Sequence, residues 1–363
     1  MTHIVDLPTP ALIVDRQRFD ANVATMAAVR PDLTLRPHIK AHKSTALAHE
    51  LAKVGHTAFT CATPREVIGM VQAGLGSDLL LANETVDPTR LRAMASLLNN
   101  SRITVAIDSD VTARMAAENG IKDVLIDVNV GMPRCGVLPE RAAALAAFAV
   151  SLGLNVRGVM GYEGHLMAVA DRDEQRTKVR SAMGVLVQCF DDVRAQSGDD
   201  CTIISAGGTG TFDLYDPSDP LLARVNEVQA GSYALMDSHY GALELPFVQA
   251  LYVVGTVISV SDSWAVIDVG LKSLGMDHGN PTIEGASVWF CSDEHITFSM
   301  KDGRPLPGIG NRVLVRPAHI DPTIALHEVM HVVDQIGTGG IGTGETGTGG
   351  RVIDAWPVNL RHW

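Results

Sequence analysis

Short hydrophobic runs alternate with longer stretches that carry an apolar residue every three or four positions, through the first two-thirds of the chain. Apolar runs of four to eight residues predict buried strands, and the longer periodic stretches predict amphipathic helices. Helices are expected at residues 45–54, 64–73 and 139–151, and a Thr or Ser commonly precedes such a stretch, as an N-cap would. Strands are expected at residues 33–40, 57–62, 78–82, 103–108, 123–128, 156–161, 202–206 and 228–233.

Eight such strands within roughly 200 residues favour an α/β fold closed as a (β/α)8 TIM-type barrel, although a doubly wound sheet would give a similar pattern. After about residue 240 the chain becomes β-rich, with the segments QALYVVGTVISV, WAVIDVG, ASVWF, HITFSM and RVLVRP. We therefore expect a barrel over residues 15–240 and a second, mostly β domain over residues 1–14 plus 241–363. The Gly/Thr-rich segment 336–350 is expected to be a mobile surface loop.

Composition narrows the possible partners and the setting. The net charge of −12 over 363 residues argues against a nucleic-acid groove, which needs clustered Lys and Arg. The N-terminus does not have the pattern of a secretory signal, and no long apolar run predicts a membrane span. The five cysteines are scattered and show no CxxC spacing, which fits a reduced, cytoplasmic setting.

Two of the predicted barrel strands end in glycine-rich segments. The residues after the strand at 202–206 read GGTGTFD, and those after Ala230 read GSYALMDSHYG. Barrels commonly bind a phosphate after their last two strands, through backbone N–H groups and hydroxyls, although many glycine-rich turns are merely tight turns.

Lys40 lies where the first predicted strand ends, at the same mouth of the barrel. A lysine there can form a Schiff base if its neighbours lower its pKa, and His38, His42 and Lys43 are expected to supply the positive charge. A lone lysine is otherwise a solvated surface cation. A phosphorylated aldehyde cofactor would span from Lys40 to the phosphate site.

A third group is the pair His319 and Asp321 in RPAHIDPT, at the end of an apolar segment of the β-rich region. On a strand, residues i and i+2 point the same way, so the imidazole and the carboxylate could converge on one ion. This ligand set suits Mn²⁺ or Mg²⁺, although such a pair is often only hydrogen-bonded within a turn.

In this order, the motifs PHIKAHKS, NVGMPRCGV, SAGGTGTFD, QAGSYALMDSHYG, DVGLKS, DEH and AHIDPT resemble those of the metal-dependent D-threonine aldolases. That family is grouped with D-serine dehydratases and D-3-hydroxyaspartate aldolases among the alanine-racemase-like pyridoxal-phosphate enzymes. The resemblance extends over nearly the full chain. It implies a lyase that cleaves a β-hydroxy D-amino acid to glycine and an aldehyde, and that works as a homodimer.

The resemblance also implies roles for individual residues. Lys40 looks like the Schiff-base lysine, Arg134 like the residue near the phenolic oxygen of the cofactor, and Tyr162 like the tyrosine facing the pyridine nitrogen. His319 and Asp321 resemble the ligands of a divalent metal. The phosphate cradle would consist of Thr209, Gly210, Gly231, Ser232 and Tyr233.

One segment departs from the family pattern. Many D-threonine aldolases read AYHGS after the sixth strand, with a further His several residues on, whereas this chain reads GYEGHL. The candidate for acid–base work on the substrate is therefore the offset His165, together with Lys40 and Tyr162.

Three other functions use similar parts. A dehydratase would give a keto acid and ammonia, but the dehydratases of this group tend to carry Cys where this chain has Asp321, which favours the aldolase. A racemase would not need the metal pair, and neither would a non-catalytic protein that only binds the cofactor.

Overall fold

The computed structural model describes residues 2–31, 34–337 and 350–363. By its internal contacts the chain divides into two compact units. We call residues 27–40, 48–231 and 360–363 the barrel unit, and residues 1–26, 41–47 and 232–359 the β unit.

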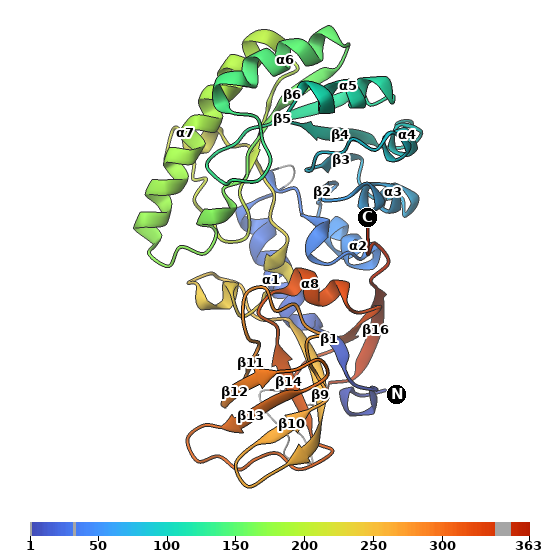
Figure 1. The fold of residues 1–363 in the computed structure, drawn as a ribbon, viewed down its shortest axis with the longest axis vertical. Helices are drawn as coiled ribbons and strands as arrows, with labels where there is room; N and C mark the ends of the chain where they lie inside the picture. Colours follow the sequence, from blue (N-terminus) through green and yellow to red (C-terminus); the bar gives the residue numbers. More distant parts are fainter. Residues whose placement is uncertain (1, 32–33, 338–349) are drawn as a thin grey trace. The chain divides into compact units, whose positions relative to one another are not determined.

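The barrel unit is built on a parallel sheet in which seven strands follow one another in sequence order, with helices on its outer side (Figure 1). Its strands are β2 (Ala58–Cys61), β3 (Asp78–Leu81), β4 (Arg102–Ile107), β5 (Asp123–Asp127), β6 (Asn155–Met160), β7 (Ile203–Ala206) and β8 (Glu227–Val228). Strands β2 to β7 are almost entirely buried, as parallel strands covered by helices are. Leu80, Ala106, Leu125 and Met160, from four successive strands, form one apolar cluster.

The barrel is closed by the segment that precedes Lys40. Leu35 bridges to Val228 of β8, and His38 bridges to Thr60 of β2, both in parallel register. The sequence predicted a full strand over residues 33–40, but only these isolated bridges form, and residue 33 lies outside the described residues. Pro37 has no N–H to donate to a ladder, which is one reason the pairing stays short.

Helix starts agree only in part with the caps that the sequence indicated, since the helix expected over residues 139–151 begins at Ala142, after a 3₁₀ turn, Pro139–Arg141. Helix α3 (Pro64–Gln72) follows Thr63, whose hydroxyl accepts a hydrogen bond from the Glu66 N–H. Helix α5 (Asp110–Glu118) follows the capping Ser109. The other helices of eight or more residues in the described part of the chain are α1 (Arg16–Val29), α2 (Thr45–Lys53), α4 (Pro88–Ala95), α6 (Ala142–Ser151) and α7 (Arg172–Ser197). The α/β fold class predicted from the sequence is confirmed.

Buried ion pairs occupy the amino-terminal ends of the barrel strands. Arg36 donates to Glu227 at 2.7 Å, and Arg157 donates to Asp78 at 2.6 Å. Arg36 is only 3% exposed, and its buried charge is compensated by Glu227 and by Asp78, whose carboxylate lies 3.3 Å away. In TIM-type barrels, residues at this end usually contribute to stability, while the opposite end carries the active site.

The β unit contains a nine-stranded sheet, in which β1 (Ala11–Asp15) pairs antiparallel with β9 (Leu251–Val260) and parallel with β15 (Val329–Val333). Its other strands are β10 (Ala265–Ile267), β11 (Thr282–Ile283), β12 (Ala286–Cys291), β13 (Ile296–Met300), β14 (Arg312–Arg316) and β16 (Val352–Pro357). The segment 336–350 joins β15 to β16, and most of it lies outside the described residues.

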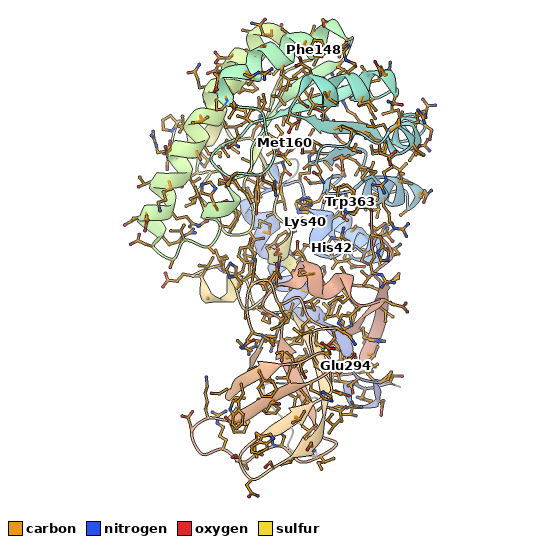
Figure 2. The ribbon with its side chains drawn as sticks, in the orientation of Figure 1. Lys40, His42, Phe148, Met160, Glu294 and Trp363 are labelled. Carbon is orange, nitrogen blue, oxygen red and sulfur yellow. The ribbon has the colours of Figure 1, made fainter. Side chains whose placement is uncertain are left out.

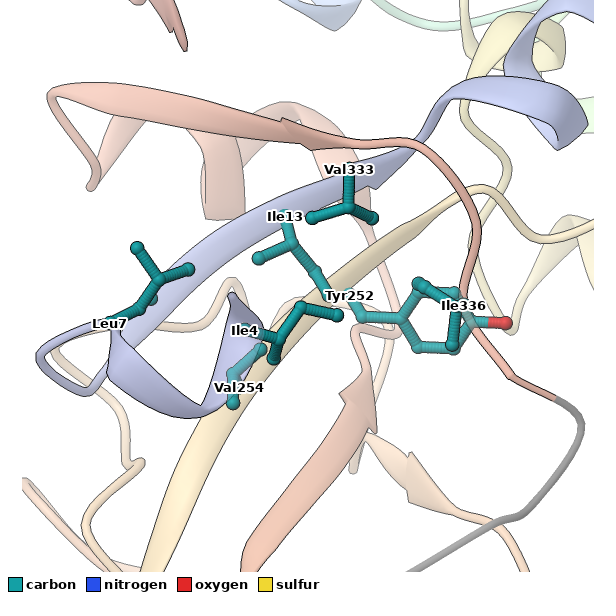
Figure 3. Close-up of a cluster of buried hydrophobic side chains, with 8 residues drawn as sticks. Ile4, Leu7, Ile13, Tyr252, Val254, Val333 and Ile336 are labelled. Carbon is teal, nitrogen blue, oxygen red and sulfur yellow. The ribbon is translucent and has the colours of Figure 1, made fainter. Parts of the chain in front are cut away.

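The buried side chains of one cluster fix β1 to its neighbours (Figure 3). Ile13 of β1 packs with Tyr252 and Val254 of β9 and with Val333 of β15. Ile4, Leu7, Ala11 and Ile336 complete this cluster. The N-terminal segment, expected from the sequence to belong to the β-rich domain, lies between β9 and β15 in this sheet.

One further prediction was wrong in extent. The last barrel strand was expected over residues 228–233, but β8 ends at Val228, and a 3₁₀ turn, Ser232–Ala234, follows. No helix in the described part of the chain is long and apolar enough to cross a lipid bilayer.

Candidate active site

Tyr162, two residues beyond the end of β6, brings two predicted site residues together in the barrel unit. The Lys40 ammonium nitrogen lies 5.8 Å from the centroid of the Tyr162 ring, and the Arg134 guanidinium carbon lies 5.2 Å from it. Lys40 itself lies in a 3₁₀ turn, Ile39–Ala41, and is labelled in Figure 2. Two cations therefore face one aromatic ring at the carboxyl ends of the strands.

The loop that carries Arg134 is folded back on itself. The Val137 N–H donates to the Asp127 carbonyl at 2.8 Å, and the Asn129 N–H donates to the Val137 carbonyl at 3.0 Å. Gly136 has φ +107°, and a Cβ there would lie 2.7 Å from the Asn129 nitrogen, so this turn requires glycine. The turn leaves Arg134 exposed beside Tyr162.

Carboxyl groups lie beneath this loop. Burial raises the pKa of Asp127 well above its usual value, and the negative charge of Glu84 and a hydrogen bond with it raise that pKa further. Burial, together with Glu84, also raises the pKa of Cys135 to about 11. Asp127, Arg134, Cys135 and Tyr162 line one small pocket, so a carboxyl group with a raised pKa and a neutral thiol face it.

The predicted phosphate residues follow β7 and β8. Thr209 is buried, and a Cβ on Gly210 would lie 2.0 Å from the Met167 carbonyl oxygen, so the loop packs directly on that backbone. Gly231 is the last residue of this segment in the barrel unit. Ser232 and Tyr233 begin the β unit, where the buried Tyr233 ring packs 5.6 Å from the ring of Phe247, centroid to centroid.

The predicted acid–base residue His165 is exposed on a 3₁₀ turn, Gly164–Leu166. A Cβ on Gly131 would lie 3.4 Å from its Cε1 atom, so the imidazole lies against the loop after β5. His165 thus lies beside the loop that carries Arg134.

One expectation about Lys40 was wrong. His42 was expected to contribute positive charge, but it is 1% exposed, and burial lowers its pKa to about 3. Its Nδ1 atom accepts a hydrogen bond from the Ser44 N–H at 3.2 Å, which needs an unprotonated nitrogen. His42 is therefore neutral at physiological pH.

The predicted metal pair lies at the start of a short helix and not on a strand. Strand β14 ends at Arg316, His319 is the N-cap of α8 (Ile320–Ala325), and Asp321 lies in its first turn. The expected alternation of strand side chains therefore does not apply. The two groups still converge, with His319 Nε2 3.6 Å from Asp321 Oδ2.

Asp277 contacts the other ring nitrogen of this histidine, with its Oδ2 atom 2.7 Å from His319 Nδ1. Partial burial opposes ionisation of Asp277, but the hydrogen bond and the charge of His319 lower its pKa overall. Ligand atoms of one octahedral ion lie roughly 3 Å apart, so 2.7 Å fits a hydrogen bond better. A carboxylate on Nδ1 leaves the Nε2 lone pair available on the side of Asp321.

His278 completes this cluster, since its ligand atom and those of Asp277 and His319 all lie within 4.8 Å of one another. Its ring stacks on that of His319 with centroids 4.1 Å apart and an interplanar angle of 3°. Imidazole lone pairs lie in the ring plane, so two parallel stacked rings do not point at one ion. His278 therefore supports His319 in this geometry.

Two protein-family models match the chain, one over most of the barrel unit and one within the β unit. Residues 14–239 match the family described as alanine racemase, N-terminal domain, and residues 250–333 match the putative serine dehydratase domain. The chain is 34% identical to a D-threonine aldolase of Arthrobacter sp over an alignment of 370 positions that covers 97% of this chain and 92% of that protein. The chain belongs to the D-threonine aldolase family.

A 3-hydroxy-D-aspartate aldolase of Paracoccus denitrificans is 26% identical to this family member over 98% of the chain and 92% of that protein. The crystal structure of D-threonine aldolase from Filomicrobium marinum superposes with a TM-score of 0.88 at 33% identity, covering 99% of this chain and 97% of that one. The resemblance drawn from the motifs and the enzyme class, a lyase, are confirmed.

Sequence reasoning missed two residues of this member of the D-threonine aldolase family. Asp277, in GMDHGN, was not connected with His319, because 42 residues separate them in the chain. Glu163 was seen only as a departure from AYHGS, yet it is fully buried and hydrogen-bonded. A lone acidic residue in a glycine-rich segment gives no signal of burial.

Proposed function

We propose that this chain is a pyridoxal-phosphate- and divalent-metal-dependent aldolase that cleaves a β-hydroxy D-amino acid of the D-threonine type to glycine and an aldehyde. The observation that carries the proposal is the convergence of Lys40 and Arg134 on the Tyr162 ring. Lys40 offers an amine for the aldehyde of pyridoxal phosphate, and Tyr162 offers an aromatic ring beside its pyridine ring.

Each residue would have a defined task in that reaction. Lys40 would bind the cofactor aldehyde and carry a proton, Arg134 would contact the phenolic oxygen, and Tyr162 would orient the ring. When bound, the cofactor supplies an electron sink and a divalent ion lowers the pKa of a hydroxyl. The proposed phosphate contacts are Thr209, Gly210, Gly231, Ser232 and Tyr233.

On the substrate side, His165 would carry a proton, since it is exposed and lies against the loop after β5. His319 and Asp321 would hold the metal, because their facing atoms are 3.6 Å apart and offer one nitrogen and one oxygen. That donor set favours Mn²⁺ or Mg²⁺.

Further parts of the proposal concern organisation and setting. The proposed domain boundaries are 15–240 and 1–14 plus 241–363, and they differ from the contact-based units at residues 15–26, 41–47, 232–240 and 360–363. We also expect a homodimer, which light scattering after size exclusion would test. A reducing, cytoplasmic setting is consistent with the five cysteines, all of which are free within the described residues.

The decisive experiment supplies the purified protein with pyridoxal phosphate, Mn²⁺ and D-threonine and measures acetaldehyde, glycine and ammonia in parallel. We expect acetaldehyde and glycine in equal amounts, lost on addition of EDTA and absent with L-threonine as the matched substrate. Ammonia with 2-ketobutyrate would instead identify a dehydratase and overturn the proposal. Aldol cleavage that persists unchanged in EDTA would show that the activity does not depend on a metal and would overturn that part of the proposal.

A further inference from the structure

Glu163 follows Tyr162 directly, at the point where the sequence departs from AYHGS. Its side chain is 0% exposed, so no ligand in solvent contacts it directly. Its carboxylate accepts hydrogen bonds from the Gly207 N–H at 3.2 Å, from the Thr211 hydroxyl at 2.8 Å, and from the Tyr215 hydroxyl. Every one of these donors belongs to the segment after β7.

This segment is the glycine-rich one that carries Thr209 and Gly210. Gly207 has φ +80°, and the Gly208 N–H donates to the Thr211 hydroxyl oxygen at 3.3 Å. On the other side, the carbonyl oxygen of Gly210 accepts hydrogen bonds from Arg172 at 3.0 Å and from Gln175 at 3.2 Å. The loop is therefore held at its start by Glu163 and at its middle by α7.

The donors to Glu163 are neutral at physiological pH. Burial raises the pKa of Tyr215, and the negative charge of Glu163 raises it further, so the phenol keeps its proton and donates it. A buried carboxylate is tolerated only where hydrogen bonds replace its water. The fixed acceptor in turn fixes the positions of its donors.

We propose that Glu163 is the positioning residue for cofactor phosphate recognition, because its single carboxylate ties the loop after β7 to the segment that carries Tyr162. The inference rests on the proposed function. Its consequence is that Glu163 determines how much the protein gains from the phosphate group, and contributes little to binding of the pyridine ring and aldehyde.

The charge of Glu163 and its role as a hydrogen-bond acceptor predict opposite effects of its replacement on phosphate binding. Replacing Glu163 by Gln removes a negative charge near a phosphate, which by simple Coulomb attraction would tighten phosphate binding. The same change replaces one carboxylate oxygen by an amide N–H₂, which then faces either the Gly207 N–H or the hydroxyls of Thr211 and Tyr215. If positioning dominates, Glu163→Gln weakens binding despite the favourable change in charge.

The test measures the dissociation constants of pyridoxal phosphate and of pyridoxal, which lacks the phosphate, for the full-length apoprotein by absorbance titration. For Glu163→Gln we expect the constant for pyridoxal phosphate to rise by about ten- to hundredfold, since buried donors lose their acceptor. The constant for pyridoxal should change by less than about twofold. Glu174→Gln, an exposed acid on α7, is the matched control.

Thr211→Val and Tyr215→Phe each remove one donor to Glu163 without changing the charge. Both should lower the preference for pyridoxal phosphate in the same direction, by a smaller factor, so the inference is tested even if Glu163→Gln does not fold. Equal losses for both ligands, or an unchanged or tighter constant for pyridoxal phosphate, would overturn the inference. A wild-type protein without any preference for the phosphorylated form would overturn the phosphate site itself, and with it the proposed function.

Discussion

Removing the carboxylate of Asp277 should weaken metal binding through His319 without removing a ligand. The 2.7 Å contact to Nδ1 fixes both the ring orientation and the nitrogen that keeps its lone pair. Loss of such a partner typically costs ten- to hundredfold in metal affinity, or about 1.4–2.7 kcal/mol. The Asp277 side chain is 54% exposed, so solvent weakens the contact, and we expect about tenfold for Asp277→Ala.

The assay follows free Mn²⁺ by electron paramagnetic resonance while the protein is titrated. Asp277→Asn keeps an oxygen that can accept a hydrogen bond from the Nδ1–H, so it should lose less affinity than Asp277→Ala. Asp262→Ala, an exposed acid in the same unit, should bind Mn²⁺ like the wild type.

Two results would refute this reasoning. Wild-type affinity in Asp277→Ala would show that the hydrogen bond does not orient His319. Complete loss of binding, as expected for removal of Asp321, would show that Asp277 is a direct ligand and that the ion lies on the Nδ1 side.

Substitutions at other positions test the remaining assignments. Lys40→Ala should abolish the visible absorbance of lysine-bound cofactor, whereas Lys43→Ala should keep it; the reverse result would mean that the wrong lysine was chosen. Asp321→Ala should lose the EDTA-sensitive activity while the cofactor absorbance remains, and activity that survives unchanged would exclude Asp321 as a ligand. Glu227→Ala leaves the buried Arg36 without its 2.7 Å partner and should lower the free energy of unfolding by about 3–5 kcal/mol in urea; a loss below about 1 kcal/mol would mean that Asp78 suffices.

Local patterns predicted well wherever burial was uniform. Strands β2 to β7 are apolar because helices cover the sheet, so their sequence alone identified them. The closing segment before Lys40 was harder, since Pro37 interrupts the ladder and the pairing comes from Val228 and Thr60, far away in sequence.

His319 and Asp321 show that an expected proximity can arise from a different local geometry. His319 and Asp321 were paired as strand neighbours, but one caps a helix and the other lies in its first turn. The i, i+2 spacing alone does not distinguish a strand from the start of a helix, because the two side chains can lie near each other in either geometry.

By itself, the sequence determined the barrel class, the β-rich second half, the order of the motifs and hence the family, because these depend on periodicity and on residues adjacent in the chain. Only the tertiary structure decided which side chains are charged and which of them are in contact. His42 is neutral because the fold buries it, and Asp277 and Glu163 gain their partners across long stretches of chain. Burial and long-range contact arise when the chain closes on itself, and a linear pattern does not contain them.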